Sequence, residues 1–318
     1  MAEPAGMTKN PGMPGLFDFF EYEGIPMPGV VLKSSLDELK TFEVRSDDVW
    51  ICTYPKSGTH FIMEMTSLIL ADGDPSKIDR TTHLATISML TMDRPLTVDS
   101  QQQRDEAPPT LSPKPFMDVI KKAPSPRMIA CHLPFQLLPP DIEKKAKVIY
   151  VARNPKDMVA SAMRFTEKTV AYPGGFNQMI IDMMNGAFSY GSWFDHVMGY
   201  WNKRNEENVL FLKFEEMKMN SADVAQRVGQ HLGRPLSPEI LEKVVTGSGF
   251  EGMKKTYDKI EKSSDKGKYL TKAAGQMSFM QKGVIGSWKE RFTVAQNEAF
   301  NKWYQDKFAG SDLQFKFE

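Results

Sequence analysis

The sequence predicts an α/β fold in which helices cover both faces of a central parallel sheet. Four short apolar runs are typical of buried strands, and helix-forming segments separate them along the chain. Strands that alternate with helices indicate parallel βαβ units. The first strand enters a loop with a proline and a glycine, and a helix leaves that loop. This order predicts a P-loop-like strand–loop–helix unit at the start of the sheet.

The predicted strands and helices follow one another from residue 34 onward. The strands are expected at 49–52, 127–131, 147–151 and 208–214. The helices are expected at 34–42, 61–70, 154 to about Phe165 and within an aromatic region at 176–201. Ser221 should cap a further helix that stops at Gly233, and Ser237-Pro238 should start another. The helix after the third strand has the clearest start, because Asn154 is a good N-cap, Pro155 fits the first position and Asp157 suits the positive end of the helix.

Composition narrows the class of protein. The chain has 318 residues with 40 basic and 40 acidic side chains, so no net charge favours nucleic acid or an anionic membrane. No run approaches the ~20 apolar residues of a membrane span. Two cysteines in apolar runs favour a reducing, cytoplasmic compartment over a disulfide framework. The five histidines lack metal-ligand spacing, so no metal site is expected.

We expect a flexible N-terminal tail at 1–15, rich in proline and glycine, and a single domain at 16–318. The proline- and glutamine-rich stretch at 93–115 predicts either a functional lid or a disordered excursion. The lysine-rich stretch at 251–276 predicts either a solvated face or a basic lid over an anion. Both pairs of alternatives stay open.

The loop after the first strand predicts an anion-binding site. A strand–loop–helix turn directs backbone N–H groups and the positive end of the helix dipole at one spot. Lys56 adds a mobile charge there, and Ser57 and Thr59 add hydroxyl groups. His132 and Arg153 follow the ends of two further strands. Because ligands of open parallel sheets sit at the carboxyl ends of the strands, these side chains should converge at one edge.

With these motifs in order, the chain resembles the cytosolic sulfotransferases from about Phe20 to its C-terminus. Segment 53–59 resembles the family's 5′-phosphosulfate loop, His132-Leu133-Pro134 its catalytic histidine segment, and 151–161 its 3′-phosphate segment. Tyr190-Gly191-Ser192-Trp193 with His196 is a further landmark. We interpret Trp193, His196 and Trp201 as packing residues, although a role in supporting the site is an alternative.

The resemblance implies a donor, 3′-phosphoadenosine 5′-phosphosulfate (PAPS), and sulfuryl transfer to a hydroxyl or amine of a small molecule, which the Met and Phe content suggests is apolar. It implies that Lys56 stabilises the phosphate leaving group. His132 is the implied general base, for which a near-neutral pKa would be suitable. Arg153 and Ser161 would hold the 3′-phosphate, and Ser161 would also temper the lysine. Phe165 matches a position that gates the acceptor pocket.

The resemblance also implies the full set of residues that contact the donor. They are Lys56, Ser57, Gly58, Thr59, His60, Phe61, Arg153, Ser161, Phe214, Ser248, Phe250, Gln281, Lys282 and Gly283. Phe61 and Phe250 would sandwich the adenine.

Four of these positions depart from the family pattern. His60-Phe61 stands for Thr-Trp, Phe214 for tyrosine and Gln281 for an arginine that contacts the 3′-phosphate. A lost charged hydrogen bond of roughly 1.5–3 kcal/mol would weaken donor binding. Outside the donor contacts, Ser287 replaces a common aspartate.

A spacing near the C-terminus resembles the family's dimer-contact motif. Its residues are Lys289, Thr293, Val294 and Glu298. The alternative is a capped surface helix with Thr293 as its N-cap. An interface of so few residues predicts a weak homodimer.

Two rival functions remain. A nucleotide kinase would need the string G-x-x-x-x-G-K-[ST] and a Mg²⁺-binding acid, whereas here Lys56 precedes Gly58 and no such string exists. A relative that binds PAPS or its desulfonated product, PAP, with lost or weakened turnover is given some weight by His60, Phe214 and Gln281. The retained Lys56, His132, Arg153 and Ser161 argue against it. A Cys131–His132 nucleophile is disfavoured, because neighbours on a strand point to opposite faces.

Overall fold

The computed structural model describes residues 17–29, 31–78, 116–169, 171–263 and 283–318. The predicted tail, the stretch at 93–115, Gln281 and Lys282 lie outside these residues. So does the lysine-rich stretch beyond residue 263. Within the described chain no helix is long and apolar enough to cross a membrane, and no group of His, Cys, Asp and Glu could hold a metal ion.

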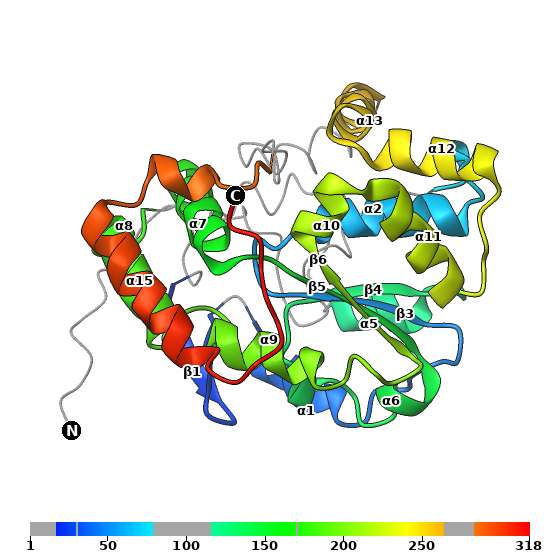
Figure 1. The fold of residues 1–318 in the computed structure, drawn as a ribbon. Helices are drawn as coiled ribbons and strands as arrows, with labels where there is room; N and C mark the ends of the chain where they lie inside the picture. Colours follow the sequence, from blue (N-terminus) through cyan, green and yellow to red (C-terminus); the bar gives the residue numbers. More distant parts are fainter. Residues whose placement is uncertain (1–16, 30, 79–115, 170, 264–282) are drawn as a thin grey trace.

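A four-stranded parallel sheet forms the centre of the molecule (Figure 1), which confirms the predicted fold class. Its order is β4-β3-β5-β6, and the strands span Val49–Thr53 (β3), Met128–Cys131 (β4), Lys147–Ala152 (β5) and Val209–Lys213 (β6). A separate antiparallel hairpin pairs β1 (Phe19–Tyr22) with β2 (Ile25–Pro28). All four predicted sheet strands are therefore present, with ends that differ by at most one residue.

Helices cover both faces of the sheet (Figure 1). The α-helices are α1 (Lys33–Leu39), α2 (Thr59–Leu70), α5 (Phe116–Lys122), α6 (Ile142–Lys145), α7 (Pro155–Thr169), α8 (Gly175–Met184), α9 (Trp193–Trp201), α10 (Phe214–Met219), α11 (Ser221–His231), α12 (Pro238–Ser248), α13 (Phe250–Ser263) and α15 (Val294–Lys307). Short 3-10 helices are η1 (Pro75–Lys77), η3 (Phe135–Leu137) and η4 (Ser287–Glu290).

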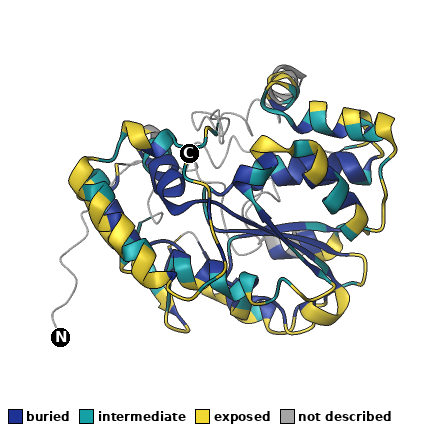
Figure 2. Ribbon diagram, in the orientation of Figure 1, coloured by how far each residue is buried: buried dark blue, intermediate teal, exposed yellow. Residues whose placement is uncertain are grey.

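The strands divide the core into two layers, because successive side chains point to opposite faces. Ile51 and Ile149 pack with α2, α11 and α12 on one face. Trp50, Cys52 and Tyr150 pack with α1 and α9 on the other. Figure 2 shows the strands buried between these layers, with exposed residues concentrated on the outer helices. Burial on both faces explains why the strands are apolar runs without alternation.

Two predicted helix caps are confirmed. The Asn154 side chain accepts a hydrogen bond from the amide of Asp157 at 2.8 Å, and α7 starts at the residue that follows Asn154. The Ser237 hydroxyl accepts from the amide of Ile240 at 3.3 Å at the start of α12.

Several predicted helix bounds differ from those in the structure. The cap of α11 is Asn220, which accepts from the amide of Asp223, and Ser221 is already helical. Phe214 opens α10 rather than ending β6, with two glutamates favouring that helix start. Helix α7 continues past Phe165 to Thr169. The region at 176–201 is two helices, because several residues between them, Tyr190 among them, have positive φ and break the helix.

A buried ion pair joins the amino-terminal ends of β3 and β4. Arg127 Nε and Nη2 donate to the Asp48 carboxylate at 2.7 and 2.5 Å, and both side chains are at most 3% exposed. Arg127 also donates to the carbonyl of Glu43 at 2.8 Å. The pair therefore fixes the two strands that lead to the Lys56 loop and to His132.

We expect Asp48→Asn to lower the free energy of unfolding by about 3 kcal/mol or more, because it leaves the Arg127 charge buried without its partner. Urea unfolding followed by circular dichroism measures this change. The matched control is Asp306→Asn, which breaks an exposed pair with Lys302 and should cost less than about 1 kcal/mol. Equal losses in the two variants would contradict a structural role for the buried pair.

Candidate functional site

The loop between β3 and α2 has the geometry of an anion site. Lys56 and Gly58 both have positive φ, 66° and 104°, and Gly58 is the N-cap of α2. No side chain of the described residues caps that helix. The positive end of α2 is thus open to an anion, and the anion site stays a prediction.

Only glycine fits at position 58. A Cβ atom there would lie 2.6 Å from Cδ2 of Phe214, in addition to the strain of the positive φ. The Phe214 ring therefore covers this side of the loop. The same ring lies under the Arg153 guanidinium, whose Cζ is 4.3 Å from the ring centroid.

Arg153 lies beside the loop with part of its hydrogen-bonding capacity unused. Its Nη1 donates to the carbonyl of Lys56 at 3.0 Å. Its Nε and Nη2, and the hydroxyl of Ser57, are buried without a hydrogen-bond partner among the described residues. Burial lowers the pKa of Arg153 to about 10, and the nearby Asp157 and Glu215 carboxylates oppose that shift. Buried unpaired donors are costly, so this cluster is suited to an anion that completes it.

Ser161 and Phe165 lie on α7 at the same end of the sheet. Ser161 is buried and stands in the second turn of the helix. The Lys56 ammonium lies 4.5 Å from the centroid of the Phe165 ring. The structure therefore brings Lys56 against the predicted acceptor-gating residue.

The ring of His132 is held in one orientation by the end of β3. Its Nδ1 lies 2.8 Å from the carbonyl oxygen of Thr53 and 3.1 Å from the Thr53 hydroxyl. Because a carbonyl oxygen only accepts, Nδ1 carries the proton and the lone pair is on Nε2. The Thr53 hydroxyl also bonds that of Thr59 at 2.7 Å, which links the histidine to the anion loop.

The pKa of His132 differs from the near-neutral value expected. Burial, with a smaller contribution from the Lys56 charge, lowers the pKa to about 4, although the hydrogen bond to Thr53 opposes the shift. His132 is therefore neutral across the physiological range. The expectation failed because sequence position does not report how far the ring is buried.

Four further predicted donor contacts come from three helices. His60 and Phe61 lie in the first turn of α2, and Phe250 opens α13. Ser248 ends α12, which packs along α2, and its hydroxyl donates to the carbonyl of Val244 at 2.7 Å. The adenine sandwich between Phe61 and Phe250 stays a prediction.

Asp157 anchors the C-terminal segment that begins at Gly283. Its carboxylate accepts from the amides of Gly286 and Trp288 at 2.8 and 2.9 Å, and from the Ser287 hydroxyl at 3.1 Å. A serine at position 287 can donate to this carboxylate, whereas an aspartate there would repel it. The sequence placed Asp157 only at a helix start and did not reveal this role.

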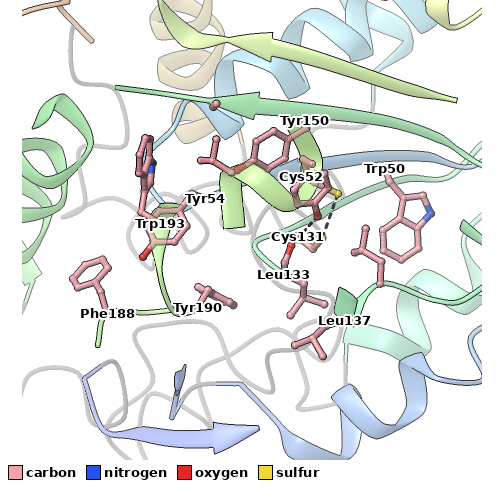
Figure 3. Close-up of a cluster of buried hydrophobic side chains, with 14 of the residues drawn as sticks. Trp50, Cys52, Tyr54, Cys131, Leu133, Leu137, Tyr150, Phe188, Tyr190 and Trp193 are labelled. Atoms are coloured by element: carbon pink, nitrogen blue, oxygen red, sulfur yellow. Dashed lines mark hydrogen bonds between the residues drawn. The ribbon is translucent and has the colours of Figure 1, made fainter. Parts of the chain in front are cut away.

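Two more site residues were missed. Thr53 was assigned to the anion loop, but its contact with the ring of His132 was not predicted. Tyr190 has a positive φ of 66°, and its ring meets that of His132 edge-on at 5.5 Å between centroids. A non-glycine residue in this conformation marks a constrained position. Cys131, by contrast, lies with its Sγ 3.6 Å from Sγ of Cys52, and both thiols are free (Figure 3).

Comparison with known proteins identifies the family. Residues 46–312 match the family described as "Sulfotransferase domain". The chain belongs to the sulfotransferase family. Sulfotransferase 1C2 from Rattus norvegicus is 35% identical over 302 residues, covering 94% of this chain and 95% of the relative. Human sulfotransferase 4A1 is 34% identical, covering 100% and 99%. The protein is therefore a sulfotransferase.

Solved structures support the same fold. Mouse sulfotransferase SULT7A1, complexed with PAP, aligns with a TM-score of 0.67 and 26% identity over 92% of this chain and 95% of that one. Retinol dehydratase, in complex with androsterone and PAP, aligns with a TM-score of 0.72 and 21% identity over 96% and 94%.

We expect the His132 ring to stay neutral down to pH 5.5 in the nucleotide-free protein. NMR titration of its Cε1 proton measures this, with the signal assigned by its absence from His132→Gln. A pKa lowered to about 4 places protonation below the titrated range, so the shift should be constant from pH 8 to 5.5. A midpoint near the ordinary 6.5 would contradict burial as the dominant influence.

Proposed function

We propose that this sulfotransferase transfers the sulfuryl group of PAPS to a hydroxyl or amine of a small, apolar acceptor, with His132 as general base. One observation carries the proposal. Buried, unpaired donors of Arg153 and Ser57 lie at the same sheet edge as a histidine whose Nε2 has a lone pair. This combination fits an anionic donor beside an acceptor that must lose a proton.

The residues present fit the donor. The α2 N-terminus and Ser57 would hold the 5′-phosphosulfate, and Arg153 with Ser161 would hold the 3′-phosphate. Gly58 leaves space where any Cβ would collide with Phe214. When bound, PAPS supplies the sulfuryl group and a phosphate leaving group. PAP in the solved structure of mouse SULT7A1 supports this choice of nucleotide.

Each reacting group has a defined task in this proposal. Nε2 of His132 takes the acceptor proton, since Nδ1 already donates to Thr53. Lys56 stabilises the negative charge that grows on the leaving group, which lowers the transition state more than the ground state. Ser161 would temper Lys56 until the acceptor arrives. No metal is invoked.

The acceptor remains a proposal of chemical class. Phe165 and Lys56 stand together, so an aromatic ring borders the reacting charge. Retinol dehydratase, a structural neighbour, binds androsterone and retinol, which are largely apolar alcohols. These observations favour an apolar alcohol or phenol.

A sulfate-transfer assay on phenols, alcohols and amines tests the function. PAPS-dependent sulfation without added metal supports it, and PAP binding without turnover on any acceptor supports the relative with lost turnover. Membership of the sulfotransferase family argues against the nucleotide kinase.

We expect Arg153→Met to weaken PAP binding about 10- to 100-fold, because one charged hydrogen bond contributes roughly 1.5–3 kcal/mol. Affinity for adenosine 5′-phosphosulfate, which lacks the 3′-phosphate, should be unchanged. Isothermal titration calorimetry measures both. Arg204→Met is the control, since Arg204 pairs with Asp312 at the surface. Equal losses for the two nucleotides would refute the assignment of Arg153 to the 3′-phosphate.

A single domain and a cytoplasmic location are part of the proposal. One core cluster joins Tyr22 of the hairpin, Trp50 of the sheet and Phe315 near the C-terminus, which supports one domain. The free, adjacent thiols of Cys52 and Cys131 support a reducing compartment.

The weak homodimer would use the start of α15. Thr293 caps this helix with Gln296 in a capping box, as the alternative predicted. The Val294 side chain is 74% exposed, so it is available for contact with a second copy of the chain. We expect Val294→Glu to shift a monomer–dimer equilibrium to monomer in sedimentation velocity. Val284→Glu, at a valine 54% exposed, is the control and should have no effect. An unchanged equilibrium in Val294→Glu would exclude this interface.

A further inference from the structure

Two side chains of α9 form hydrogen bonds with the main chain at His132 and the residue after it. His196 Nε2 lies 3.0 Å from the carbonyl oxygen of His132. The Tyr200 hydroxyl donates to the next carbonyl, that of Leu133, at 2.7 Å. Two consecutive carbonyls after β4 are thus bonded by two residues one helical turn apart, which is the spacing that puts side chains on one face of a helix.

The hydrogen bonds fix the protonation of His196. Since the His132 carbonyl can only accept, His196 Nε2 carries a proton. Its Nδ1 lies 2.9 Å from the Tyr150 hydroxyl, which therefore donates to it. Burial lowers the pKa of His196, so the ring is neutral and Nδ1 keeps the lone pair that this bond needs. Tyr150 thereby selects the tautomer that binds His132.

The surrounding rings leave His196 little room to turn. Tyr150 and Tyr200 stack at 3.9 Å between centroids with an interplanar angle of 12°. Tyr54 meets the His196 ring edge-on at 5.1 Å, and its hydroxyl donates to the carbonyl of Gly191 at 2.8 Å. Figure 3 shows Tyr54 and Tyr150 in this buried cluster together with Leu133.

We propose that His196 is a positioning residue for sulfuryl transfer: its Nε2–H holds the main chain of His132 so that the base presents Nε2 to the acceptor. The inference rests on the proposed function of His132. It replaces our interpretation of His196 as a packing residue. A packing role would need only the shape of the ring, whereas this role needs a hydrogen-bond donor at the Nε2 position.

Four variants separate these roles. His196→Leu removes the donor, His196→Gln places an amide N–H near the Nε2 position, and His196→Asn places one near Nδ1, too short to reach His132. The control is His231→Leu, which removes a half-buried histidine at the end of α11. His231 lies near the amino-terminal end of β5, at the edge of the sheet opposite the site.

Two measurements are made on each variant. The first is kcat with saturating donor and acceptor, beside the Kd for PAP. We expect His196→Leu and His196→Asn to lower kcat about 10- to 100-fold, since misplacing a reacting group by about 1 Å has effects of that size. The Kd for PAP should stay within about twofold. His196→Gln should restore most of kcat, and His231→Leu should leave it unchanged.

The second measurement is the ¹⁵N NMR spectrum of the His132 ring in the nucleotide-free protein. The wild type should show one tautomer, protonated at Nδ1, and His196→Leu should show a mixture. This result does not depend on turnover. If the wild type sulfates no acceptor, the proposed function fails while the spectrum still tests the positioning.

Three outcomes would overturn the inference. One is a folded His196→Leu with wild-type kcat and an unchanged His132 tautomer. Another is a His196→Gln variant as slow as His196→Asn, which would deny a need for the donor at Nε2. The third is a parallel loss of kcat and PAP affinity, which would indicate general damage. If His196→Leu does not fold, the comparison of Gln with Asn decides.

Discussion

The parallel pairing of β3 with β4 and β5 decides where each proposed reacting group lies. The register places Cys52 opposite Cys131 and Tyr150, so the chain leaves all three strands at one level. The Lys56 loop, His132 and Arg153 each follow within a few residues of those ends. Both faces of the sheet are buried, and a slip of one residue would turn every core side chain toward the wrong layer. The same burial that stabilises the fold therefore fixes the site.

Buried donors without hydrogen-bond partners at the site lower the stability of the fold. Arg153 is 3% exposed, and two of its nitrogens find no partner among the described residues. A folded protein tolerates such a group where the surrounding structure is rigid enough to hold it. Here the carbonyl of Lys56 and the ring of Phe214 hold the guanidinium before any ligand arrives. Donors fixed in advance do not have to be ordered when an anion binds, so less of the binding free energy is lost.

Local signals were enough to predict the sheet, the caps at Asn154 and Ser237, and the convergence of Lys56, His132 and Arg153. Each of these depends on a short run of residues or on the rule that parallel strands end at one edge. Contacts between distant segments could not be predicted. Asp157 and Ser287 are 130 residues apart, and His196 and His132 are 64 apart. Nor does a sequence state how deeply a histidine is buried, which is why the near-neutral pKa of His132 was wrong.

The low pKa of His132 connects the proposed base to the proposed anion site. Burial makes the neutral ring a weak base, and the Lys56 charge weakens it further. An anion held by Lys56 and Arg153 would offset that charge and raise the pKa of His132, so the ring would become a stronger base once the donor is in place. Thermodynamic linkage makes the effect reciprocal, because a proton on His132 would then tighten anion binding by the same factor. Thr53 bonds both His132 and Thr59, so a single hydroxyl joins the two sites that this coupling requires. A donor anion bound at Lys56 would therefore remove part of the charge that weakens His132, while the larger effect of burial would stay.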